Sequence, residues 1–87
     1  MPSERRWPKG DLTVEFGRNL FLERRRAWMS QEKPAARAGL HRTEIGLLEN
    51  GRREPRLSTL LKLSEALELD PQRLLKGLGA ETRDSPS

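Results

Sequence analysis

The sequence predicts an all-α domain built from five short helices. No segment of the 87 residues shows a sustained alternation of apolar and polar residues, which is the pattern expected of a half-buried strand. Apolar residues instead recur at intervals of three and four between residues that begin and end helices. Hydrophobic residues make up only 33% of the chain, so the helices are expected to share one small core.

A first helix is expected from about Leu12 to Ala27. Asp11 precedes it, and an aspartate at the N-cap accepts a hydrogen bond from a free backbone amide of the first turn. Phe16 and Leu20 are four residues apart and therefore lie on one face of this helix.

Two short helices follow in close succession. The second opens in the run Ser30 to Lys33 and stops at Gly39, a residue that takes the left-handed conformation without strain. The third runs from His41 to Asn50, and Gly51 closes it. A short turn containing glycine between two such helices is typical of a helix-turn-helix, which is therefore predicted at about residues 30–50.

The last two helices complete the domain. The fourth begins after Pro55, at Leu57, and Asp70-Pro71 supplies an N-cap and a proline at the first position of the fifth. An apolar stripe on the fifth helix consists of Leu74, Leu75 and Leu78. We therefore expect a flexible N-terminal arm at residues 1–11, a helix-turn-helix domain at 12–78 and a disordered tail at 79–87.

The composition excludes several classes of function. The chain has no cysteine and a single histidine, so neither thiol chemistry nor a cysteine-based zinc site is expected, and no cofactor is predicted. Its carboxylates lack the partners of a catalytic constellation, so the chain is not expected to be an enzyme. No apolar run exceeds three residues and the N-terminus has no apolar core, which predicts a cytoplasmic protein without a membrane span or signal peptide.

The basic charge is concentrated in the middle of the sequence. The formal net charge is +4, and residues 24–56 carry nine basic against four acidic residues, a local excess of +5. Such an excess is expected where a protein contacts phosphates. A solvated charged surface is the alternative that charge alone leaves open.

The third helix has a face suited to DNA. On a helical wheel Ile45 and Leu48 point inward, and Glu49 lies at the edge of the buried face. The outward side is small and polar, with Arg42 near its N-terminal end, and comprises Thr43, Gly46, Leu47 and Asn50. Arginine can pair with guanine through two hydrogen bonds, and threonine can contact a base edge. This pattern favours insertion of the third helix into a major groove.

These residues, in this register, resemble the Cro/C1-type phage repressor family, also called the Xre family. The resemblance rests on Gly17, Arg24, Ser30-Gln31-Glu32, Ala35, Ala38-Gly39-Leu40, Ile45, Leu48-Glu49-Asn50-Gly51-Arg52 and Pro55. It covers about residues 16–75 and implies a five-helix, lambda-repressor-like DNA-binding domain. The stretch from Gly39 to Thr43 is also similar to the small controller proteins of restriction–modification systems.

The resemblance implies roles for individual residues. Arg42 and Thr43 would read base edges, with Leu47 beside them, and Arg24 with Glu49 would form a structural ion pair. His41 would either contact a base or simply cap the third helix. The residues expected to hold the DNA backbone are Gln31, Asn50, Arg52 and Arg53. Arg56 would approach either the backbone or the minor groove.

The family resemblance also implies a regulator of transcription that binds a palindromic site on double-stranded DNA as a homodimer. Leu74, Leu75 and Leu78 are expected to contribute to the dimer, or alternatively to close the monomer core. A second hypothesis is an antitoxin or adaptor whose helix-turn-helix domain mainly binds a protein partner. Two residues of the third helix, which would be the recognition helix that enters the groove, favour this alternative. Gly46 weakens this helix, and Leu47 stands where a polar base-reading side chain is common.

Besides Gly46 and Leu47, three residues depart from the family pattern. Pro34 is expected to disturb the second helix, and a helix start at Pro34 itself would displace Gln31 from its phosphate. Trp28 stands where glycine is usual, which makes a left-handed conformation costly. Glu23 replaces an apolar residue, and we expect Leu22 or Phe21 to fill that space.

Overall fold

The computed structural model describes residues 9–78, with side chains from residue 12 onward. Five α-helices and no strands are present in this part of the chain, so the all-α prediction is confirmed. The helices are α2 (Lys9–Arg26), α3 (Glu32–Ala38), α4 (Arg42–Glu49), α5 (Leu57–Ala66) and α6 (Pro71–Leu74). None of them is long and apolar enough to cross a membrane.

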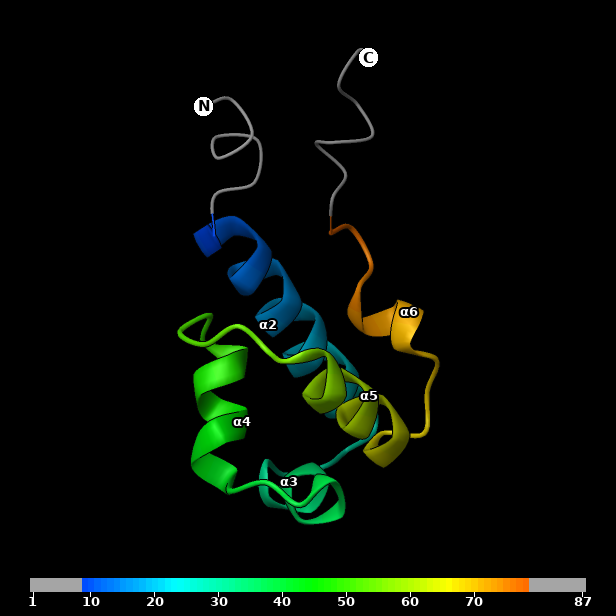
Figure 1. Ribbon diagram of the computed structural model, residues 1–87. Helices are drawn as coiled ribbons and strands as arrows, with labels where there is room; N and C mark the ends of the chain where they lie inside the picture. The colour runs from blue at the N-terminus through cyan, green and yellow to red at the C-terminus, as the bar shows by residue number, and fades with distance from the viewer. Residues whose placement is uncertain (1–8, 79–87) are drawn as a thin grey trace, which may run out of the picture.

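The helices surround one apolar core (Figure 1). Helix α2 packs against α4 and α6, while α3 packs against α4 and α5. The largest fully buried side chains come from four different helices and from Pro34 of α3: Phe16, Leu20, Ile45, Leu48, Leu63 and Leu74. The inward direction predicted for α4 from Ile45 and Leu48 is therefore confirmed, since both are 0% exposed.

Helix α2 begins earlier than the sequence predicts. It starts at Lys9, so Asp11 belongs to the first turn rather than to the N-cap. An acidic residue is favourable at either place, because both lie near the positive end of the helix dipole, and the residue type therefore did not locate the boundary. The expected arm thus loses residues 9–11 to the helix, while residues 1–8 and the tail at 79–87 lie outside the described residues.

Pro34 does not break α3. The helix begins at Glu32, which puts Pro34 at its third position, and the proline ring is buried. The first backbone amides of a helix have no partner within it, so a proline there removes no helical hydrogen bond. The expected disturbance, and the alternative start at Pro34, are both wrong for this reason.

A close approach of two helix backbones fixes how α2 meets α4. A Cβ atom added at Gly17 would lie less than 2.5 Å from the carbonyl oxygen of Leu48 and 2.7 Å from that of Glu49. No side chain fits in that space, so only glycine allows this contact. The end of α4 is thereby held directly against α2.

Two helices end in a left-handed residue that is not glycine. Trp28 has φ 59° and Glu68 has φ 58°. After α2, Trp28 N donates to Arg25 O at 3.0 Å and Met29 N donates to Arg24 O at 3.2 Å, the pair of bonds that defines a Schellman C-cap. The costly left-handed conformation expected at Trp28 is therefore present, and the indole is 95% exposed.

The side chain of Glu23 is itself buried and forms ion pairs with two arginines. Its carboxylate accepts from Arg26 Nη1 at 3.3 Å and lies 3.1 Å from Arg73 Nη2, so it links α2 to α6. Leu22 and Phe21 remain 43% and 37% exposed. The expectation that one of them would take the place of Glu23 is wrong, because two guanidinium groups offset the cost of burying the carboxylate.

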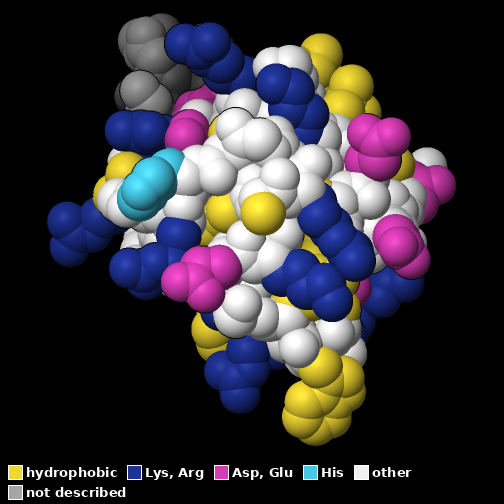
Figure 2. All heavy atoms as spheres, turned by 90° about the horizontal axis from the view of Figure 1, so that it is seen from below, with side chains coloured by type: hydrophobic (Ala, Val, Ile, Leu, Met, Phe, Trp, Pro, Cys, Tyr) yellow, Lys and Arg dark blue, Asp and Glu magenta, His cyan; other side chains and the backbone are white. Residues whose placement is uncertain are grey.

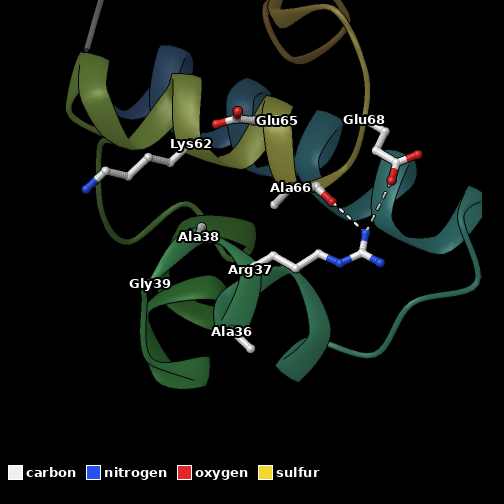
Figure 3. Close-up of a pocket in the computed structure, with 8 residues that line it drawn as sticks. All are labelled: Ala36, Arg37, Ala38, Gly39, Lys62, Glu65, Ala66 and Glu68. Atoms are coloured by element: carbon white, nitrogen blue, oxygen red, sulfur yellow. Dashed lines mark hydrogen bonds and ion pairs between the residues drawn. The ribbon is translucent and has the colours of Figure 1, made fainter.

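An arginine from α3 caps the end of α5 (Figure 3). Arg37 Nη1 donates to the carbonyl oxygen of Ala66 at 3.0 Å and lies 3.8 Å from the carboxylate of Glu68. The last carbonyls of a helix have no partner within it, and a cation near that end is favourable. Arg37 therefore fastens the first helix of the helix-turn-helix to α5.

The C-terminal stripe divides between the core and the surface. Leu74 is 0% exposed and belongs to the core, so its predicted contact with a second copy is wrong and the alternative, closure of the monomer, holds. Leu75 is 40% exposed and Leu78 packs partly buried against the core. Burial of Leu74 follows because α6 packs against both α2 and α5.

Replacing Trp28 by glycine is expected to stabilise the fold by about 1 kcal/mol, because it removes the strain of a left-handed non-glycine residue. Urea unfolding measures the change. Trp28→Ala is the matched control, since alanine keeps the strain and deletes only an exposed side chain, and it should change stability by less than about 0.5 kcal/mol. An equal effect of both variants would show that loss of the indole, and not relief of backbone strain, causes the change in stability.

Candidate nucleic-acid interface

Helices α3 and α4 form the helix-turn-helix. Gly39 ends α3 with φ 73°, and its amide donates to the carbonyl oxygens of Ala35 and Ala36. Leu40 and His41 complete the turn, after which α4 stands upright beside α3 (Figure 1). The left-handed glycine turns the chain between α3 and α4 within three residues, so that the two helices lie at a steep angle (Figure 1).

The N-terminal end of α4 is exposed and capped. His41 Nδ1 accepts a hydrogen bond from the backbone amide of Thr43 at 3.0 Å, so the imidazole serves as the N-cap of α4. Arg42 is exposed, with its Nε 3.8 Å from the carboxylate of Glu32. An ion pair between two exposed side chains contributes little, so the Arg42 guanidinium is available to a ligand at small cost.

The side of α4 that faces away from the core is exposed at its ends and partly buried at its centre. Thr43 and Asn50 are exposed, whereas Gly46 and Leu47 are partly buried. The side chain nearest to Gly46 is that of Gln31, from the start of α3. This surface therefore combines hydrogen-bonding groups at both ends of α4 with a small apolar centre.

A buried ion pair fixes α4 against the rest of the domain. Arg24 Nε donates to Glu49 Oε2 at 2.5 Å and Arg24 Nη2 donates to Glu49 Oε1 at 3.1 Å. Arg24 Nη1 also donates to Met29 O at 2.8 Å, and Gln31 Nε2 donates to Glu49 Oε1 at 3.1 Å. The pair implied by the resemblance is thus present, and with these bonds it ties α2, α4 and the 27–31 connection that leads into α3 together.

Gln31 is a member of this network. Gln31 lies just before Glu32, the first residue of α3, and its side chain does not cap that helix. The hydrogen bond to Glu49 holds the amide beside Gly46, at the margin of α4. The start of α3 at Glu32 therefore leaves Gln31 next to the recognition helix.

Three arginines follow α4 on the connection to α5. Arg52, Arg53 and Arg56 are all exposed. Arg53 Nη1 lies 3.4 Å from the carboxylate of Glu44 on α4, and Arg56 precedes α5 without a side-chain cap. The connection thus carries a local basic excess close to the end of α4.

The structure brings one further basic residue to this surface. A shallow hollow of about 410 Å³ is lined in part by Gln31 and Asn50, and by Arg18 and Phe21 from α2. Within residues 12–78, Arg18 forms no ion pair. Residues 1–23 carry four basic and four acidic residues, so the charge pattern of the sequence gave Arg18 no role. Its helical spacing with Val14 and Phe21 is the signal that puts these residues on one face of α2.

Positive side chains dominate much of this end of the molecule. Figure 2 shows it from below Figure 1, with Lys and Arg groups projecting at several points around a pale surface of backbone and small polar groups. A few acidic groups lie among them. Basic side chains that a phosphate backbone could meet are spread over this face, with acidic ones beside them.

The fold and this surface define a helix-turn-helix domain. A family profile described as Helix-turn-helix, HTH_3, matches residues 22–74. The chain therefore belongs to this family of Cro/C1-type helix-turn-helix proteins.

Several known proteins are similar to the chain. The control protein C.SmaI of Serratia marcescens is 45% identical over 77 residues, which cover 83% of this chain and 92% of C.SmaI. The crystal structure of the restriction–modification controller protein C.AhdI of Aeromonas hydrophila has a TM-score of 0.69 at 39% identity, over 71% of this chain and 94% of C.AhdI. A hypothetical transcription factor from Neisseria, NHTF, has a TM-score of 0.73 at 29% identity, over 86% of each chain.

Glu49→Gln is expected to cost about 3 kcal/mol of stability, because it leaves the nearly buried Arg24 guanidinium without a counter-ion. Thermal or urea unfolding measures it. Glu44→Gln is the matched control: it removes the same charge from a more exposed pair with Arg53 and should cost less than about 1 kcal/mol. Similar losses in the two variants would contradict a special role for the buried pair.

Proposed function

We propose that the chain binds a palindromic DNA site as a homodimer and thereby controls transcription, without catalysis. It is a DNA-binding transcriptional regulator by family. The observation that carries the finer proposal is the exposed face of α4, held in place by the Arg24–Glu49 pair. In this proposal α4 enters the major groove, where its outward side chains reach base edges.

The contacts divide into two groups. Arg42 and Thr43, at the exposed start of α4, would read base edges, with Leu47 against the apolar part of a base. Residues around this face would hold the phosphates and set the register: Arg18, Gln31, Asn50, Arg52, Arg53 and Arg56. His41 contributes as the cap of α4 through Nδ1, and the Nε2–H of the same exposed ring would donate to DNA without breaking that cap.

A dimer would place two such helices about 34 Å apart, in successive major grooves of an imperfect palindrome. Leu75, which is 40% exposed, and the partly buried Leu78 remain the proposed apolar contacts between the two copies. A cytoplasmic location agrees with a role on DNA.

The names of two relatives support a particular kind of regulator. C.SmaI and C.AhdI carry names that describe control proteins, and C.AhdI is called a restriction–modification controller. We propose the same role here, since the match to C.SmaI spans nearly the whole of that protein.

Site selection from random duplex DNA, followed by affinity measurements on Arg42→Ala, tests the proposal. The variant is expected to lose about 10- to 100-fold in affinity for the selected site, because one base contact is worth about 1–3 kcal/mol. Lys76→Ala is the control, since it removes one exposed positive charge from the segment that follows α6, and this segment lies apart from α3 and α4 in Figure 1. It should retain the specificity ratio.

Unchanged affinity of Arg42→Ala would show that the assigned base contact is wrong. If no sequence is selected and binding is weak and steeply salt-dependent, only a basic surface remains. That result would favour the antitoxin or adaptor hypothesis.

A further inference from the structure

Gly46 lies in the middle of α4, where glycine weakens the helix. The helix runs from Arg42 to Glu49, and the carbonyl oxygen of Gly46 accepts the amide of Asn50 at 3.0 Å. Glycine in a helix interior is less stable than alanine, because its backbone loses more freedom on folding. A glycine at this place therefore needs a reason.

The described residues give no structural reason for this glycine. For each of the other four glycines between residues 17 and 77, either an added Cβ atom would clash with backbone atoms, as at Gly17, or φ is positive, as at Gly39. Gly46 has neither: a Cβ atom there would meet only the amide of Gln31, at 3.7 Å and 4.0 Å. These are ordinary van der Waals distances, so the folded chain would accept alanine.

The space left by the missing side chain opens on the proposed interface. Thr43 and Asn50 lie three residues before and four residues after Gly46, on the same side of α4. Gln31 borders the space from α3. All three bordering residues belong to the set that the proposed function assigns to DNA.

We propose that Gly46 is a close-approach residue, which admits the DNA strand held by Gln31 and Asn50 against the backbone of α4. The inference rests on the proposed function and deepens it. Gln31 Nε2 already donates to Glu49 Oε1, but its second hydrogen and the Asn50 amide can each donate to a phosphate oxygen, so the proposal places the sugar–phosphate backbone in this space. Gly46 thereby sets how deeply α4 enters the groove.

Gly46→Ala separates folding from binding. The variant is expected to raise Tm by about 4 °C, because alanine favours the helix. It is also expected to lose about tenfold in affinity for duplex DNA. The loss should be the same for the selected site and for a scrambled site, because the sugar–phosphate backbone is the same in every sequence. A less stable variant would overturn the premise that nothing inside the domain requires glycine.

A second variant distinguishes contact with DNA from disturbance of Gln31. Gln31→Ala removes the amide that the new methyl group would touch, and Gly46→Ala should still lose about tenfold when added to it. Loss of the effect in that background would overturn direct contact with the strand, since the two changes would then act through one side chain.

The remaining outcomes are also decisive. Equal affinity of Gly46→Ala and the unaltered chain would overturn this inference and leave the proposed function intact. A loss confined to the selected site would assign the space to a base edge instead of the strand. If the unaltered chain binds no duplex DNA, the proposed function fails and this inference with it.

Discussion

The hydrogen-bonded ion pair between Arg24 and Glu49 is the contact on which the geometry of the interface depends. It joins the end of α2 to the end of α4, and its side chains are only 10% and 4% exposed. Arg24 also holds the 27–31 connection through Met29 O, and Glu49 holds Gln31. A buried ion pair contributes little net stability compared with apolar packing, so its main effect here is to fix one relative placement of α2, α3 and α4.

Several features of the fold oppose local stability and are tolerated because the surroundings compensate. Trp28 and Glu68 adopt left-handed conformations, yet their helix ends are closed by two backbone hydrogen bonds each. Glu23 is buried, but Arg26 and Arg73 neutralise it. Gly46 is different, because no contact with the part of the chain that the structure describes compensates for its cost. That contrast is the physical basis for looking outside the molecule for its role.

The interface combines elements that are far apart in the sequence. Arg18 from α2, Gln31 from the start of α3 and Asn50 from the end of α4 line one hollow. The basic excess in residues 24–56 predicts a phosphate-binding surface, but it does not include Arg18, which only the packing of α2 against α4 brings to this place. Charge along a chain and charge on a surface differ for this reason.

Local chemistry in the sequence determined the helices, their order and the inward face of α4. The spacing of apolar residues marks which face of a helix is buried. Asp70 with Pro71 begins a helix, and Gly39 and Gly51 end helices, through backbone preferences that operate without the rest of the fold. The resemblance in the Leu48–Arg52 segment also implied the Arg24–Glu49 pair. The tertiary structure decided what depends on distant partners: burial of Leu74 under α2 and α5, the pairing of Glu23 with Arg73, and the fit of Pro34 in the first turn of α3. Burial and ion pairing are properties of the packed helices, and residue types alone do not specify which surfaces will meet.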